Sequence, residues 1–206
     1  YLHVTVKDTD ANKVGRAFSN KAVEMALANY PGFFVTSPPG DATPFGVYWP
    51  ALVPSELLHH EVVLGAERIA IAPTSPTTSE ADVPAVKIGQ PPSGATERLP
   101  LGVLCGARSG DKGGNANVGL WVKNSGAYAW LASYLSVERF KELVPEAQAL
   151  KVERFELPNL LSLNFVVYGL LGDGVAASTR SDPQAKSFGE FVRAKMVDIP
   201  RSLLGA

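Results

Sequence analysis

The residues best suited to chemistry lie in one short segment, residues 107–117, which reads ARSGDKGGNAN. Six of these eleven residues are Gly, Asn or Asp, which tolerate unusual backbone angles. Glycines allow successive backbone N–H groups to converge on an anion, and a neighbouring Arg or Lys completes a pocket for a carboxylate or a phosphate. The segment therefore predicts an anion-binding loop, suited to an acyl thioester or its phosphorylated carrier.

The side chains of this segment suggest individual roles. Asp111 is a candidate general base or metal ligand, and Lys112 is a second candidate catalytic residue that also helps Arg108 to hold the anion. The amides that would orient a substrate or donate to an oxyanion are Asn115, Asn117 and Asn164. The remaining candidate substrate-binding residues are Ser109, Gly110, Gly113, Gly114, Gly172 and Gly174. Ser109 lacks the context of a nucleophile elbow, which makes it a weak nucleophile candidate.

A flexible hairpin loop is the alternative interpretation of residues 107–117. The segment lacks the spacing and the hydroxyl of a phosphate-binding Walker loop. Asn164 lies in an apolar run, where an unpaired amide costs about 1–3 kcal/mol, so we expect it to bond to backbone or to ligand. Gly172 and Gly174 either support the pocket or form a helix C-cap and turn.

The histidines and the cysteine do not indicate a metal site. His59 and His60 are adjacent, and neighbours on a strand point to opposite faces, so they cannot easily share one metal. Cys105 falls on a predicted buried strand, where a thiol acts as a small apolar residue. No metal and no cofactor are predicted.

Composition excludes several classes of partner. The 19 basic and 20 acidic side chains nearly cancel, so nucleic-acid and membrane-surface partners are not expected. One cysteine cannot form an intrachain disulfide, which favours a reducing compartment and a cytoplasmic location. No apolar stretch approaches the roughly 18–20 residues of a spanning helix.

The first third of the chain predicts a small α/β segment, residues 1–72. Alternation predicts strands at residues 2–6 and 33–36, and helical spacing predicts a helix at residues 18–27 capped by Ser19. Residues 61–64 and 68–71 predict a hairpin. The Pro, Ser and Thr content of residues 73–100 predicts a linker.

Residues 101–206 predict a second domain. Strands are expected at residues 101–105, 117–122 and 150–155, and helices at residues 130–144, with Ser136 as a cap, and after Asp182-Pro183. The apolar run at residues 160–171 suits a buried strand or helix, and its length favours a helix. This order predicts an α+β fold, an open and mainly antiparallel sheet with helices on one face, of the ferredoxin-like kind.

Four ordered motifs carry a resemblance to a known family: residues 107–119, residues 156–165 with ELPNL and LNF, residues 172–174 (GDG) and residues 180–186 (RSDPQAK). They resemble the C-terminal, ferredoxin-like domain of acyclic-terpene-utilisation (AtuA-like) proteins. Residues 1–72 resemble, more loosely, the end of the larger domain that precedes it. Residues 37–41 (SPPGD) replace a glycine-rich stretch of the family, and most of the larger domain is expected to lie upstream.

Members of this family are associated with breakdown of acyclic terpenes such as citronellol and geraniol, beside acyl-CoA carboxylases. The resemblance therefore implies a protein that acts on or binds a branched acyl-CoA or a terpenoid carbonyl compound, with acyl-CoA as a possible substrate. It assigns no reaction class. The alternative is a non-catalytic subunit or assembly domain, partnered by an upstream AtuA-like domain or another subunit in a homo- or hetero-oligomer.

Overall fold

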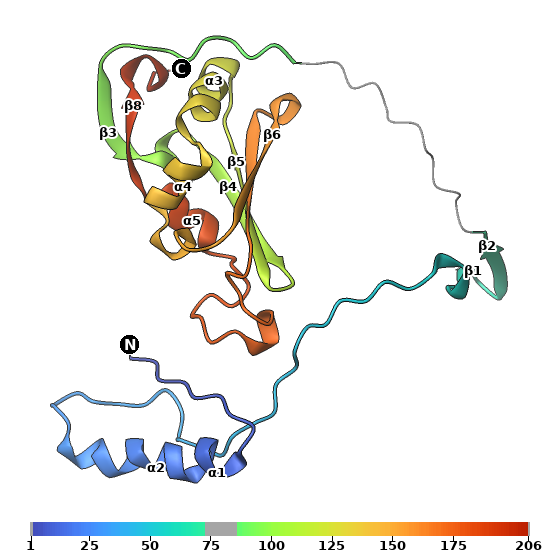
Figure 1. Cartoon of the computed structure of the whole chain (residues 1–206), viewed down its shortest axis with the longest axis vertical. Coiled ribbons are helices and arrows are strands. Elements are labelled where there is room, and N and C mark those ends of the chain that lie inside the picture. Colours follow the sequence, from blue (N-terminus) through green and yellow to red (C-terminus); the bar gives the residue numbers. More distant parts are fainter. Residues whose placement is uncertain (1, 73–85, 206) are drawn as a thin grey trace. The chain divides into compact units, whose positions relative to one another are not determined.

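A computed structural model describes residues 2–72 and 86–205 (Figure 1). Contacts divide the chain into two units, residues 1–47 and residues 48–206. Nearly all the buried side chains lie after residue 100, and Ser19 is the single buried residue between residues 2 and 72. The residues that form a packed core therefore belong to the C-terminal part of the chain.

The described residues of the first unit form two short α-helices, α1 (Ala11–Val14) and α2 (Arg16–Met25), and a 3-10 turn at Ala26–Ala28. The Asp10 side chain caps α1 by accepting a hydrogen bond from the Asn12 N–H at 2.9 Å. The predicted helix is confirmed, but it starts after Gly15 and Ser19 lies within it. The predicted strands at residues 2–6 and 33–36 are wrong, because neither segment has a pairing strand in the part of the chain that the structure describes.

Strands β1 (His60–Leu64) and β2 (Glu67–Ile71) form the antiparallel hairpin that the sequence predicts. Val62 pairs with Ile69 on one face of the hairpin, and an ion pair between Glu61 and Arg68, at 2.9 Å, lies on the other. All ten strand residues are exposed. The apolar face of the hairpin is therefore unpartnered among the described residues. An isolated two-stranded hairpin is only marginally stable in water.

The C-terminal domain is built on an antiparallel sheet of four strands in the order β4-β5-β7-β6 (Figure 1). These strands are β4 (Gly106–Lys112), β5 (Asn115–Trp121), β6 (Val152–Leu157) and β7 (Ser162–Val167). Helices α3 (Ser125–Tyr134), α4 (Val137–Leu143) and α5 (Phe188–Arg193) cover one face of the sheet. The expected α+β arrangement, an open antiparallel sheet with helices on one face, is therefore confirmed.

Alternation along the two central strands supplies the core. Val118 pairs with Phe165 across β5 and β7, and both are fully buried. Phe140 of α4 stacks on Phe165 with ring centroids 4.3 Å apart, and Phe188 of α5 meets Phe140 edge-on at 6.4 Å. Every second residue of each strand thus faces the helices, which leaves the residues between them on the opposite face.

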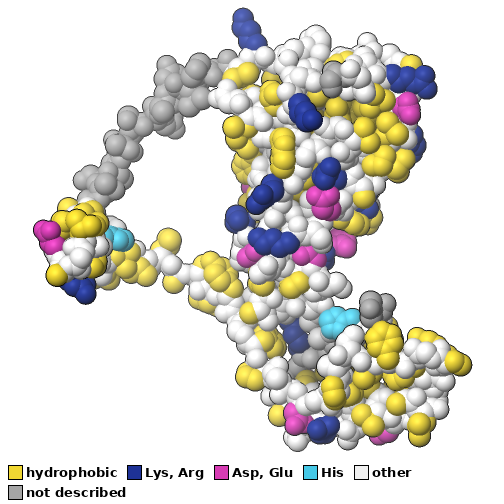
Figure 2. All heavy atoms as spheres, turned by 180° about the vertical axis from the view of Figure 1, so that it is seen from behind, with side chains coloured by type: hydrophobic (Ala, Val, Ile, Leu, Met, Phe, Trp, Pro, Cys, Tyr) yellow, Lys and Arg dark blue, Asp and Glu magenta, His cyan; other side chains and the backbone are white. Residues whose placement is uncertain are grey.

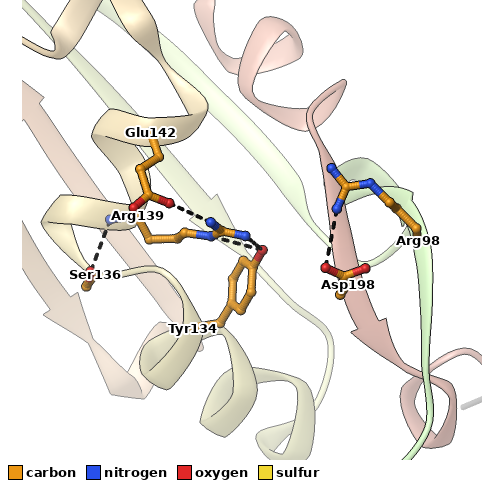
Figure 3. Close-up of polar contacts among 6 residues, drawn as sticks. All are labelled: Arg98, Tyr134, Ser136, Arg139, Glu142 and Asp198. Atoms are coloured by element: carbon orange, nitrogen blue, oxygen red, sulfur yellow. Dashed lines mark hydrogen bonds and ion pairs between the residues drawn. The ribbon is translucent and has the colours of Figure 1, made fainter.

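Capping side chains set the starts of α3 and α4. Asn124 accepts from the Ala127 N–H at 2.8 Å, and Ser136 accepts from the Arg139 N–H at 3.1 Å, as predicted for Ser136. The Arg139 guanidinium then donates to the Tyr134 hydroxyl at 2.8 Å and pairs with Glu142 (Figure 3). This contact ties the end of α3 to α4.

A second sheet joins the two ends of this domain. Strand β3 (Thr96–Pro100) pairs with β8 (Met196–Pro200), and Arg98 forms an ion pair with its cross-strand partner Asp198 at 3.3 Å (Figure 3). β3 falls inside the segment predicted as a linker; residues 73–85 of that segment lie outside the described residues.

Three element predictions in this domain are wrong. Residues 101–103 form a short 3-10 helix and not a strand, although Leu101 and Cys105 are buried. Residues 160–171 contain strand β7 and a turn, because Gly169 and Gly172 take positive φ angles that end regular structure. The last helix, α5, starts after Ser187, and Met196 lies in β8. In the part of the chain that the structure describes, no helix has the length and apolar character to cross a membrane.

Candidate functional site

Residues 107–117 form most of a tight β-hairpin. The prediction that this segment is a loop between two strands is therefore wrong. Register runs continuously from Gly106 opposite Trp121 to Lys112 opposite Asn115, so the turn consists of Gly113 and Gly114. Gly113 alone in this segment has a positive φ, 62°. A nest of converging N–H groups needs alternating backbone conformations, so the extended strands do not provide the predicted backbone pocket.

Strand alternation divides the predicted site residues between two faces of the sheet. Ser109 pairs with buried Val118 and Asp111 with buried Ala116, so both point toward the helices. The predicted residues on the opposite face are Arg108, Gly110, Lys112, Asn115, Asn117 and Asn164. We call this surface the open face, because its side chains are not buried by α3, α4 or α5.

Two asparagines meet at the centre of the open face. The Asn117 amide of β5 donates to the Asn164 side-chain oxygen of β7 at 3.1 Å. This bond gives each of the two partly buried amides one hydrogen-bond partner, as the sequence requires of Asn164. It leaves the Asn164 amide N–H groups and the Asn117 side-chain oxygen without a partner among the described residues. The pair therefore retains the Asn164 N–H groups as donors and the Asn117 oxygen as an acceptor for a ligand.

Arg108 projects from the edge strand β4 beside this pair. Its side chain is exposed, and none of the described residues forms an ion pair or hydrogen bond with its guanidinium. Its cross-strand neighbour is Gly119, which is in turn opposite Asn164. A methyl group at Gly119 would meet no atom closer than 3.8 Å. Gly119 therefore places no side chain between the unpaired guanidinium and the amide pair.

Apolar side chains lie on the open face along the edge strand β6, at Phe155 and Leu157, and at the end of β5, at Trp121. Trp121, Phe155 and Leu157 are 40%, 46% and 40% exposed. The Trp121 indole lies so close over Gly106 that a methyl group there would be 2.4 Å from its ring. Figure 2, seen from behind the view of Figure 1, shows apolar patches beside basic side chains on this side of the domain. The open face thus combines positive charge, amides and apolar surface.

Ser109 and Asn115 are occupied by structural bonds. The Ser109 hydroxyl accepts from the Gly189 N–H of α5 at 2.7 Å and donates to the Lys186 carbonyl at 3.3 Å. The Asn115 side chain accepts from the Gly169 N–H at 2.9 Å. These bonds within the fold are sufficient to explain why a serine and an asparagine stand at these positions. Their predicted roles in substrate binding stay predictions.

The hairpin turn that contains Gly114 packs against the turn that contains Gly172 and Gly174. The Leu171 N–H donates to the Gly114 carbonyl at 2.9 Å, and a methyl group at Gly114 would be 2.2 Å from the Gly172 oxygen. Gly172 and Gly174 have φ angles of 59° and 101°, which favour glycine. The close approach of the two turns accounts for Gly114, and the positive φ angles account for Gly172 and Gly174, without a ligand.

The two candidate catalytic residues do not share a site with the amide pair. Asp111 faces the helix side of β4, away from Asn117 and Asn164. Lys112 lies at the turn end of the open face, where its ammonium donates to the Asp111 carbonyl at 3.1 Å. Acid–base work by Asp111 on a ligand held by the asparagines therefore has no geometric support, and the two catalytic roles stay predictions.

The sequence interpretation missed a carboxylate on the open face. Glu153 of β6 accepts from the Tyr168 hydroxyl at 2.7 Å and pairs with Lys151 at 2.6 Å. Hydrogen bonds from Lys151 and Tyr168 hold the pKa of Glu153 below its ordinary value, so it is ionised at neutral pH. Alternation along residues 150–155, which predicts a strand, was the available signal for this residue.

Cys105 is not a candidate nucleophile. Burial raises the pKa of its thiol to about 12, and a thiol rather than a thiolate is a poor nucleophile. Among the described residues, no group of three or more His, Cys, Asp or Glu side chains has an arrangement that could hold a metal ion.

Comparison with known proteins gives two matches, both to family profiles. The profile described as the AtuA ferredoxin-like domain matches residues 99–198, from the end of β3 into β8. The profile described as acyclic terpene utilisation family protein AtuA matches residues 1–64. Searches of curated proteins and of solved structures found no match.

Proposed function

Because this chain belongs to the acyclic terpene utilisation (AtuA) family, with an AtuA ferredoxin-like domain at residues 99–198, we propose that its open face binds a branched acyl or terpenoid carbonyl compound. The family places the protein in acyclic terpene utilisation.

One observation carries the proposal: an unpaired Arg108 guanidinium and the Asn117–Asn164 amide pair lie on the same sheet face as exposed Trp121 and Phe155. A branched acid or acyl thioester has the matching parts, an oxygen-rich head and an apolar chain. Ligand sites commonly combine apolar walls with a few polar groups that fix orientation. The pattern fits this ligand class better than a nucleic acid, since the formal net charge is −1.

Each part of the open face has a distinct task. The Arg108 guanidinium donates to the anionic group of the ligand, and its planar fork suits a carboxylate. The Asn164 amide donates to a carbonyl oxygen, and the first carbons of the chain lie against Gly119, where no side chain is present. Trp121 and Phe155 cover the branched tail, which gains free energy as apolar area leaves water.

Isothermal titration of the protein with citronellic acid, and with citronellol as the matched uncharged ligand, tests this function. Arg108→Gln is expected to weaken binding of the acid by about 1.5–3 kcal/mol, the usual contribution of a hydrogen bond to a charged group. Arg98→Gln is the matched control, because Arg98 is exposed in β3 and pairs with Asp198. Equal losses in the two variants, or no binding to the wild type, would contradict the proposal.

A second candidate function is that of an assembly domain without catalysis. Residues 2–72 expose many large apolar side chains, among them Leu27, Trp49 and Leu52, which are 101%, 87% and 103% exposed. Such surface is typical of chain segments that contact a partner. Sedimentation at several concentrations tests this alternative: it predicts a concentration-dependent oligomer and no binding of citronellic acid.

A further inference from the structure

Lys186 lies outside the predicted site, yet its side chain reaches the open face. A methyl group at Gly110 would be 3.4 Å from the Lys186 Nζ. Gly110 pairs with Asn117 and therefore presents its missing side chain to the open face. The Lys186 backbone instead lies on the helix side of β4, where its carbonyl accepts from Ser109. The lysine stem thus passes around the edge strand and places its ammonium over Gly110.

The backbone that carries Lys186 is held firmly. The Asp182 carboxylate accepts from the Lys186 N–H at 2.8 Å and from the Ser187 N–H at 2.9 Å, and the Ser187 hydroxyl donates to it at 2.8 Å. These bonds, with the contact to Ser109, anchor the segment before α5. The lysine is therefore attached to a fixed segment, which limits the entropy that a ligand must remove.

The charge of Lys186 has no described counterpart. None of the described residues forms an ion pair or hydrogen bond with its ammonium. Asp182 is engaged by backbone N–H groups, and Glu153, in the same cross-strand row as Gly110, is already paired with Lys151. Arg108 is also unpaired and precedes Gly110 by two residues on the same face, a spacing of about 7 Å along a strand.

We propose that Lys186 and Arg108 form a two-cation subsite over Gly110 that binds the oxyanion of the ligand, a carboxylate or a phosphate. This inference rests on the proposed function, because it names the head group of the ligand at the same open face. A monodentate ammonium and a planar guanidinium on one group of oxygens bind more strongly than either alone. The Asn117–Asn164 pair then contacts the atoms next to the oxyanion.

Titration of the full chain with three probes, citronellic acid, coenzyme A and citronellol, tests the subsite. Lys186→Gln is expected to lower the affinity for whichever anionic probe binds by about tenfold or more. The affinity for citronellol is expected to stay unchanged. Lys186→Arg restores most of the affinity, because it keeps the charge. Lys141→Gln on α4, which lies on the helix side of the sheet, is the matched control and is expected to bind like the wild type.

The outcomes separate the subsite from the function on which it rests. Lys186-sensitive binding of citronellic acid identifies a carboxylate, whereas Lys186-sensitive binding of coenzyme A identifies a phosphate. One result would refute the subsite and leave the proposed function standing: citronellic acid binds, Gly119→Val abolishes this binding, and Lys186→Gln does not change it. If none of the probes binds to the wild type, both are refuted.

Discussion

Ser109 is the residue at which a structural role and a catalytic role are most easily separated. Its hydroxyl accepts from the Gly189 N–H at 2.7 Å, and Gly189 is buried. Ser109→Ala leaves that N–H without a partner, which costs about 1–3 kcal/mol. Urea unfolding is expected to show this loss, while Ser181→Ala, at an exposed position, leaves stability unchanged.

The same variants are informative about binding. Because Ser109 points away from the open face, Ser109→Ala is expected to bind citronellic acid like the wild type once both are folded. A variant with unchanged stability and abolished binding would show that Ser109 contacts the ligand, and would restore the role suggested by its sequence context.

At the scale of the elements, the packing of two turns makes Gly114 intolerant of a side chain. A methyl group there would be 2.2 Å from the backbone oxygen of Gly172, and the backbone must move to receive it. Gly114→Ala is expected to destabilise the protein by about 1–3 kcal/mol. Gly119→Ala, whose methyl group meets nothing closer than 3.8 Å, is expected to change stability by less than about 0.5 kcal/mol. Thermal unfolding of the pair measures the difference, and similar midpoints would contradict the turn contact.

The sequence predicted elements whose signals are local. Ser136 caps α4 as expected, and the hairpin at residues 60–71 has the predicted pairing. The run at residues 160–171 was misassigned because both faces of its strand carry uncharged residues, so apolar content alone does not distinguish a strand from a helix. The β8 partner of β3 lies about a hundred residues away, and such pairing leaves no local pattern.

The candidate site was predicted in part for the same reason. Arg108, Gly110, Asn117 and Asn164 were selected from the sequence, and the structure places them on one face. The glycine content of residues 107–117 suggested a loop, whereas in the hairpin Gly110 lies against the Lys186 ammonium and Gly114 lets a neighbouring turn approach closely. Lys186 was missed because its reach across an edge strand depends on tertiary structure.

For the whole molecule, the distribution of buried residues predicts which part resists proteolysis. Residues 2–72 bury one side chain, whereas β3 to β8 enclose the core. Brief trypsin treatment is therefore expected to cut after Arg68 and after the exposed Lys87, and to spare Arg98, which is paired within β3 and β8. Mass spectrometry would identify a resistant fragment that starts at Ile88. Early cleavage between residues 106 and 198 would contradict the assigned core.

The most direct test of the central claim is a map of amide chemical shifts during titration with citronellic acid. The open face predicts that the largest changes occur at Arg108, Asn117, Gly119 and Asn164 and at the Trp121 indole N–H, with Lys186 also shifted by the oxyanion. Residues of α3 and α4, on the covered face of the sheet, are expected to stay unchanged. Changes confined to those helices or to residues 2–72, with the open face unaffected, would contradict the account.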